Sequence, residues 1–161
     1  MTHPSLDYEL LLAQAKAVTD NEPNALANLA NVAALLFDAL HAVNWAGFYL
    51  LRDGELVLGP FQGKSACVRI PVGSGVCGTA VAQDRIQLVD DVHAFDGHIA
   101  CDANSMSEIV LPIRRDGAVI GVLDIDSPIH ARFSDEDAQG LVPIATLVSE
   151  IIGRESRSIG I

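Results

Sequence analysis

The chain has 161 residues, of which 50% are hydrophobic and only 5% are aromatic. This size and composition predict one globular α+β or α/β domain with an aliphatic core. The formal net charge of −11 argues against nucleic acid and anionic membranes as partners, since both are negatively charged. The N-terminus lacks a basic signal-peptide region, and no apolar run reaches the roughly 18 residues of a membrane-spanning helix, so we expect a cytoplasmic protein.

Residues 1–43 predict two helices. Leucine, alanine and valine recur there at the three- and four-residue spacing of a helical face, and Pro23 stands where a helix can begin. We expect both apolar faces to pack in the core. They comprise Leu6, Leu10, Ala13 and Ala17 in the first helix and Ala25, Leu29, Val32, Leu36 and Leu40 in the second.

A β-hairpin is predicted next, because two β-rich runs flank the turn signal Arg52-Asp53-Gly54. A short strand at 66–71, a short helix entered through glycines at 73–83 and a strand at 86–92 follow. Residues 93–107 lack periodicity and are rich in Gly, Asp, Asn and Ser, which predicts a long loop. Loops of this length in compact domains usually carry function.

A second hairpin is predicted over residues 107–126. We expect a three-residue loop at 115–117, which would pair Glu108 with Asp124 and leave one sheet face wholly apolar. A two-residue loop would instead mix acids into the apolar face. The opposite face then gathers three carboxylates, those of Glu108, Asp124 and Asp126.

A final amphipathic helix is predicted to open at Ser134 and Asp137, which match a capping box, and to kink at Pro143. No internal repeat or linker divides the chain. We therefore expect a single domain over residues 1–161.

The three carboxylates have two interpretations. They can form an ordinary solvated sheet face, or they can act together, because the other residues on that face are apolar and crowded acids in apolar surroundings raise each other's pKa. A carboxyl group that stays protonated near neutral pH can donate a proton to an oxygen, and an ionised neighbour can bind an ammonium group. Trp45 and Tyr49 share one face of the first hairpin, where they can pack in the core or line an apolar pocket.

The chain has three cysteines, Cys67, Cys77 and Cys101. An odd number in a reducing compartment argues against a structural disulfide framework, and the spacing matches no zinc motif, even with His93 and His98 included. Thiolates form most readily near helix N-termini, which favours Cys77, whereas Cys101 lies in the long loop. The residues alone leave open which thiol reacts and whether some are buried core cysteines.

Four segments of the chain resemble the free methionine-(R)-sulfoxide reductases, a family of single GAF domains. They are NWAGFYL, LGPFQGKSACVRIPVGSGVCGTAV, GHIACDANSMSEIVLPI and GVLDIDSP. The resemblance runs in order from Asn44 to Phe133 and includes all three cysteines. It implies an α+β GAF-like fold, in which the N- and C-terminal helices cover one face of an antiparallel sheet of about five to six strands and the ligand pocket lies on the other. Departures at Ser65, Ser74 and Asp96 concern loop rigidity, not the chemistry.

The resemblance also implies an activity, the reduction of free L-methionine-(R)-sulfoxide. In this scheme Cys101 is the nucleophile, Cys67 the resolving cysteine and Cys77 an auxiliary cysteine. Thiolate attack leaves a sulfenic acid, which becomes a disulfide that a thioredoxin-type reductant reopens, with no cofactor or metal. The substrate-binding residues implied are Trp45, Tyr49, Glu108, Asp124 and Asp126.

Three points remain open in the sequence, namely the class of protein, the use of the first helix and the donor to the substrate carboxylate. The chain can instead be a GAF module that binds a small regulatory ligand without catalysis, or a zinc-binding structural module. An apolar face such as that of the first helix more often packs in the core. It can also support a homodimer, as helices of GAF domains often do. The donor to the substrate carboxylate is not identified, with Arg69 or a backbone amide as candidates.

Overall fold

The computed structural model describes residues 5–97 and 104–154. Four α-helices and one short 3-10 helix accompany six strands in this part of the chain. The helices are α1 Tyr8–Thr19, α2 Ala25–Ala39, α3 Gly75–Gln83, η1 Val92–Ala94 and α4 Asp135–Arg154. The strands are β1 Trp45–Arg52, β2 Glu55–Gly63, β3 Arg69–Pro71, β4 Gln87–Val89, β5 Ser107–Arg115 and β6 Ala118–Ser127.

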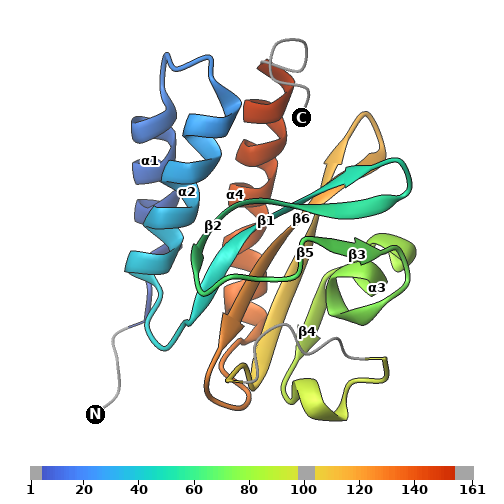
Figure 1. The fold of residues 1–161 in the computed structure, drawn as a ribbon. Coiled ribbons are helices and arrows are strands. Elements are labelled where there is room, and N and C mark those ends of the chain that lie inside the picture. The colour runs from blue at the N-terminus through green and yellow to red at the C-terminus, as the bar shows by residue number, and fades with distance from the viewer. Residues whose placement is uncertain (1–4, 98–103, 155–161) are drawn as a thin grey trace.

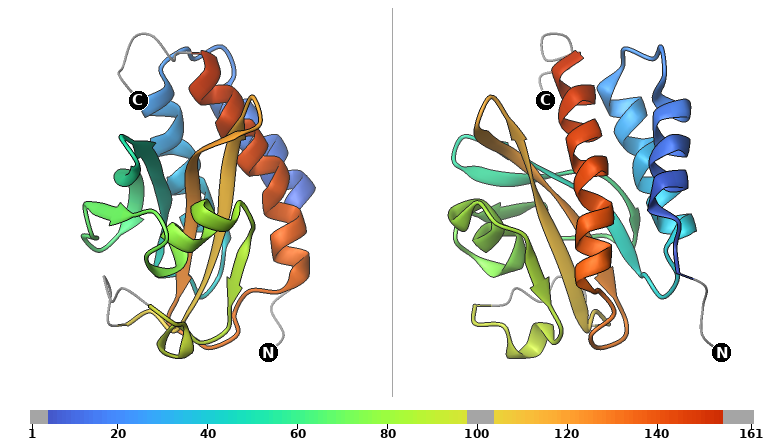
Figure 2. Two further views of the ribbon diagram at one scale, coloured as in Figure 1. Left: turned by 90° about the vertical axis from the view of Figure 1, so that its right-hand side faces the viewer. Right: turned by 180° about the vertical axis from the view of Figure 1, so that it is seen from behind.

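The strands form one sheet in the order β3-β2-β1-β6-β5-β4, and every neighbouring pair is antiparallel. Helices α1, α2 and α4 lie together on one side of the sheet, whereas α3 lies on the other (Figures 1 and 2). This is the predicted α+β architecture. Among the described residues, no helix combines the length and the apolar character needed to cross a membrane.

The sheet separates two hydrophobic clusters. The larger one joins α1, α2 and α4 to side chains such as Phe48, Leu111 and Leu123. The smaller one lies on the face covered by α3 and contains Trp45 and Tyr49. Alternate residues of the same strands therefore serve different faces, as the two-residue period of a strand requires.

The predicted core face of the first helix is wrong. Leu10, Ala13 and Ala17 are exposed, and the buried residues of the helix are instead Leu11, Ala15 and Thr19. Of the predicted residues, Leu6 alone packs partly against the larger cluster. The run Leu10-Leu11-Leu12 is apolar on more than one side of the helix, so its spacing does not fix the orientation. The contacts of α1 with α2 and α4 select the face that is buried.

The core face of α2 agrees with the prediction. All five of its predicted positions, from Ala25 to Leu40, are buried. The helix begins after Asn24, whose side chain accepts a hydrogen bond of 2.8 Å from the backbone N–H of Ala27. Pro23 therefore precedes the N-cap residue, where it can end the preceding turn without disturbing the helix.

Both predicted hairpins form, but the register of the second one is wrong. The turn has two residues, Asp116 and Gly117, with φ values of 52° and 78°. Positive φ at both positions is the geometry of a tight hairpin turn. Arg115 consequently pairs with Ala118, and Glu108 pairs with Asp126 rather than with Asp124.

A β-bulge explains why the predicted faces are nonetheless right. The register shifts between Ile113 and Arg114, which pair with Gly121 and Val119 and leave Ile120 without an opposite residue. One extra residue in β6 restores the alternation that a two-residue turn would have reversed. The apolar face and the acidic face of this hairpin are therefore kept.

The other elements differ from the prediction mainly in length. The strand expected at 66–71 is reduced to β3, and residues 64–68 connect it to β2. Helix α4 has the predicted capping box, since the N–H of Ser134 donates to Asp137 and the N–H of Asp137 donates to the Ser134 hydroxyl, at 2.8 and 3.2 Å. It continues through Pro143 to Arg154, and the kink at Pro143 stays a prediction.

Candidate active site

The three central strands place the predicted substrate-binding residues on the face that α3 covers. Strand pairing aligns them in rows that cross β1, β6 and β5. The rows are Trp45 with Asp126 and Glu108, then Gly47 with Asp124 and Val110, then Tyr49 with Val122 and Pro112. The acids therefore lie beside the aromatic residues, at the end of the sheet where β1 begins.

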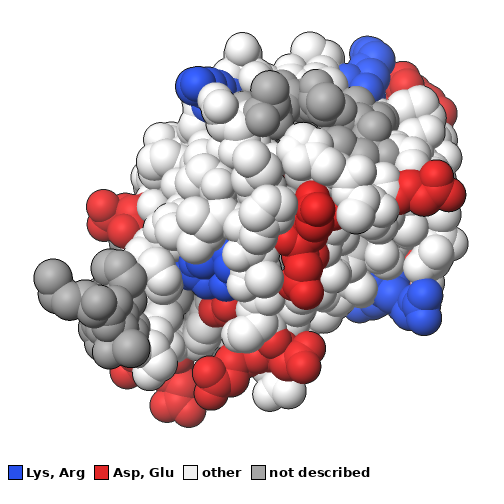
Figure 3. Space-filling view, turned by 90° about the horizontal axis from the view of Figure 1, so that it is seen from below, with Lys and Arg blue, Asp and Glu red and all other residues white. Residues whose placement is uncertain are grey.

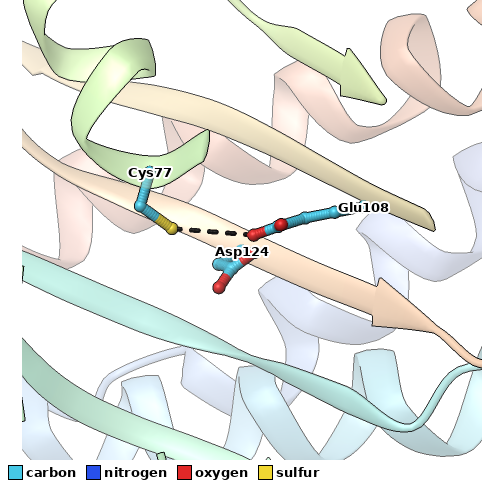
Figure 4. A group of neighbouring side chains, drawn as sticks. All are labelled: Cys77, Glu108 and Asp124. Carbon is cyan, nitrogen blue, oxygen red and sulfur yellow. Dashed lines mark hydrogen bonds between the residues drawn. The ribbon is translucent and has the colours of Figure 1, made fainter. Parts of the chain in front are cut away.

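Helix α3 adds Cys77 to this acidic group. Its Sγ donates a hydrogen bond of 3.8 Å to Oε1 of Glu108, and Figure 4 shows the thiol pointing from the helix toward Glu108 and Asp124. The ligating atoms of these three side chains all lie within 4.8 Å of one another, a spacing that a metal ion could bridge. Cys77, Glu108 and Asp124 retain only 4%, 7% and 5% of their exposure.

Burial changes the acid–base properties of the two deepest carboxyl groups. The pKa of Glu108 is raised by burial and further by the negative charges of Asp124 and Asp126. Burial also raises the pKa of Asp124, although hydrogen bonds from Glu108 and Cys77 act in the opposite direction. When these two carboxyl groups hold one proton between them, the proton lies on Glu108, and Asp124 is the group that ionises first.

One oxygen of this group has no partner. Oδ1 of Asp124 is buried and accepts no hydrogen bond from any residue that the structure describes. A buried acceptor without a donor costs free energy unless a ligand supplies the donor. The arrangement therefore favours a cationic or hydrogen-bond-donating ligand.

Cys77 is held as a thiol. Burial raises its pKa, and the neighbouring charges of Asp124, Glu108 and Asp126 raise it further. The helix N-terminus, which favours a thiolate at Cys77 in the sequence, is outweighed by these effects. The sequence pattern gives the position of Cys77 but not the acids that pack against it.

Trp45 and Tyr49 are buried, and their polar atoms are directed at a neighbouring loop. The indole N–H of Trp45 donates to the backbone oxygen of Lys64 at 3.1 Å, and the Tyr49 hydroxyl donates to the backbone oxygen of Cys67 at 2.9 Å. The two rings stack, with centroids 5.8 Å apart. The sequence predicts their shared face but not these bonds.

Gly47 makes room for the aromatic group. A Cβ atom at this position would lie 2.3 Å from Cβ of Phe61, whose ring stacks on Trp45 at a centroid distance of 5.1 Å. Gly47 also faces Asp124 across the strands. The sequence gives no signal for this role of Gly47, because it depends on the pairing of β1 with β2.

The structure describes only some of the remaining candidate residues from the sequence. Cys67 is half-buried and disulfide-bonded, whereas Cys77 is a free thiol. Cys101 and His98 lie outside the described residues. Arg69 is exposed and forms an ion pair of 2.7 Å with Glu55, which places its guanidinium at the surface rather than among the acids.

The chain is similar to proteins of known family and known structure. Residues 27–153 match the family model of the GAF domain. The chain is 60% identical over 145 residues to the free methionine-R-sulfoxide reductase of Escherichia coli, covering 90% of this chain and 88% of that protein.

Two solved structures of substrate complexes are also similar. The chain superposes on free methionine-R-sulfoxide reductase from Neisseria meningitidis in complex with its substrate with a TM-score of 0.90 and 42% identity, over 99% of each chain. For fRMsr of Staphylococcus aureus in complex with substrate the TM-score is 0.88 and the identity 53%, over 94% of this chain and 99% of that one.

Proposed function

Because the chain belongs to the free methionine-R-sulfoxide reductase family of GAF-domain proteins, we propose that it reduces free L-methionine-(R)-sulfoxide to methionine. The observation that carries this proposal is the buried acidic group, with the unpartnered Oδ1 of Asp124. A free amino acid has an α-ammonium group that can supply the missing donor. A methionine sulfoxide inside a peptide has a neutral amide there, which would leave the buried carboxylate unpaired.

The three acids have two different roles in this proposal. Asp124 and the half-buried Asp126 bind the ammonium group, and Glu108 keeps its proton and donates a hydrogen bond to the sulfoxide oxygen. The raised pKa of Glu108 supports this assignment. Trp45 and Tyr49 supply the apolar wall against which the methyl end of the substrate packs.

The redox step uses the thiols. The Cys101 thiolate attacks the sulfoxide sulfur, the oxygen is transferred to Cys101 as a sulfenic acid, and methionine leaves. The Cys67 thiol then attacks the sulfenic sulfur, which forms a disulfide and releases water. A dithiol reductant of the thioredoxin type reduces that disulfide. The disulfide-bonded state of Cys67 and the free, high-pKa thiol of Cys77 support Cys67 as the resolving cysteine and Cys77 as auxiliary.

A coupled assay tests the proposal. The purified protein is mixed with L-methionine-(R)-sulfoxide, thioredoxin, thioredoxin reductase and NADPH, and NADPH oxidation is followed. We expect turnover in the wild type and none above background in Cys101→Ser. Binding of the sulfoxide without turnover would contradict the enzyme proposal and favour a GAF module that only binds a small ligand.

We also propose a homodimer formed through α1. Leu10 and Val18 on this helix are 54% and 48% exposed, so two apolar side chains of α1 are accessible to a second copy of the chain. Analytical ultracentrifugation tests the proposal. A single species at the monomer mass of 17.1 kDa at all concentrations would contradict it.

A further inference from the structure

The segment that carries Cys67 is attached to the sheet at three points. This connection, residues 64–68, runs from β2 to β3, and three of its backbone oxygens accept hydrogen bonds from the sheet. Trp45 Nε1 bonds to Lys64 O at 3.1 Å, the Tyr49 hydroxyl to Cys67 O at 2.9 Å, and Leu58 N to Val68 O at 2.9 Å. Two of the three attachments are therefore made by side chains.

Tyr49 makes the attachment at Cys67 itself. Its ring is almost fully buried between β1 and the smaller cluster, with 2% of its exposure, and it stacks on Trp45. Burial and the nearby charge of Asp124 raise the pKa of the hydroxyl, so it remains a donor at every physiological pH. The hydroxyl thus forms a short link between a rigid strand and the backbone of a reactive cysteine.

We propose that Tyr49 is a positioning residue for Cys67, and that its hydroxyl sets the rate at which the Cys67 thiol closes the disulfide. This inference rests on the proposed function and adds a role to the apolar contact assigned to Tyr49 above. In the step concerned, the Cys67 sulfur bonds to the sulfenic sulfur, the S–O bond breaks and water leaves. No further oxidant or reductant is needed.

The expected effect follows from the geometry of closure. Reaction between two groups of one molecule is fast because both are held in place, and small displacements lower the rate steeply. A single intramolecular hydrogen bond typically stabilises its geometry by about 0.5–1.5 kcal/mol. Removing the Tyr49 hydroxyl should therefore slow closure by about three- to tenfold, while the segment stays attached through Lys64 and Val68.

The test compares Tyr49→Phe with Tyr8→Phe. Tyr8 is a matched control, since its hydroxyl is also hydrogen-bonded, to Oδ1 of Asp137 at 2.6 Å, but it packs against the larger cluster on the opposite face. Reduced protein is mixed with one equivalent of L-methionine-(R)-sulfoxide. Methionine release is followed by chromatography, and the surviving sulfenic acid is measured by trapping with dimedone.

We expect Tyr49→Phe to slow closure about three- to tenfold more than it slows methionine release, and therefore to accumulate trapped sulfenic acid. Tyr8→Phe should behave as the wild type in both steps. Closure at the wild-type rate in Tyr49→Phe would overturn the proposal. A slower release of methionine with unchanged closure would also overturn it, because Tyr49 would then act on the substrate alone.

A second assay works without the sulfoxide. Diamide oxidises two thiols to a disulfide and is itself reduced to the hydrazine, so it measures closure directly in the reduced protein. Tyr49→Phe should close the disulfide about three- to tenfold more slowly with diamide as well. Trp45→Phe should slow closure less, because Trp45 bonds to Lys64, three residues before Cys67, whereas Tyr49 bonds to Cys67 itself. If the wild type releases no methionine, the proposed function fails, and the diamide rates still decide the role of Tyr49.

Discussion

At the scale of single residues, Glu108 distinguishes this site from a solvated sheet face. Its carboxyl group is buried beside two other acids and a thiol, and it keeps a proton that an exposed glutamate would lose. An acid held protonated in this way can assist the departure of an oxygen. The assignment leads to two predictions that separate its chemical role from its effect on stability.

The first prediction concerns activity. Glu108→Gln should lower the single-turnover rate of methionine formation by at least about 100-fold, because an amide cannot transfer a proton. Glu55→Gln is the matched control, since Glu55 forms only an exposed ion pair on β2 and such pairs contribute little. Equal and small effects of the two substitutions would return Glu108 to a structural role.

The second prediction concerns stability as a function of pH. The unfolded chain loses the Glu108 proton near pH 4.5, whereas the folded protein keeps it to higher pH because its pKa is raised. Between these two pKa values the folded state binds more protons, so the free energy of unfolding falls as pH rises. The melting temperature of Glu108→Gln, relative to the wild type, should increase from pH 4.5 to pH 8. A constant difference would contradict the raised pKa.

The third prediction separates the two described cysteines. Cys77→Ser should keep thioredoxin-coupled turnover within about threefold, because a hydroxyl can still donate to Glu108 and the high-pKa thiol forms no thiolate. Cys67→Ser should release about one methionine per protein and then stop, because no resolving thiol remains. Steady turnover in Cys67→Ser would assign the resolving role to another thiol.

At the scale of elements, the sequence predicted which helices and strands form better than how they pair. The alternation of apolar and acidic residues in β5 and β6 was sufficient to assign their faces. The register depended on a bulge at Ile120, and nothing in the local sequence distinguishes it from an ordinary strand residue. The spacing of leucines does not predict the orientation of α1 for a related reason, since tertiary contacts with α2 and α4 select the buried face.

The fourth prediction tests how α4 packs on α1. A Cβ at Gly140 would lie 2.2 Å from the Tyr8 ring, whereas the nearest described neighbour of a Cβ at Gly153 would be the Arg115 side chain, at 3.4 Å. Gly140→Ala should therefore destabilise the protein by about 1–2 kcal/mol, because overpacking outweighs helix propensity. Gly153→Ala, the same change in the same helix, should stabilise it by up to about 1 kcal/mol. Urea unfolding measures both, and equal effects would contradict the packing.

At the scale of the whole molecule, the main hydrophobic core and the candidate site lie on opposite faces of one sheet. The helices at both ends of the chain cover one face, and the candidate site occupies the other, where β1, α3, β5 and β6 meet (Figure 2). On the underside, acidic side chains gather along one edge (Figure 3), in keeping with the net charge of −11.

The contacts of the site could not be read from the chain because they join distant segments. Glu108 and Asp124 lie 31 and 47 positions after Cys77 in the sequence, yet all three side chains meet within 4.8 Å. The alternation of residues in the second hairpin places the two acids on one face, and the resemblance of the sequence to a known family adds Cys77. Their burial, the location of the proton and the bond from Tyr49 to Cys67 required the fold.

The central claim is that the buried acids bind the ammonium group of a free amino acid that is then reduced. Single-turnover assays with free L-methionine-(R)-sulfoxide and with its N-acetyl derivative test it most directly, since only the free form carries the ammonium group. The account predicts about one thioether released per reduced protein from the free sulfoxide, none from the N-acetyl form and none in Cys101→Ser. Equal reduction of the two sulfoxides, or release of methionine by Cys101→Ser, would contradict it.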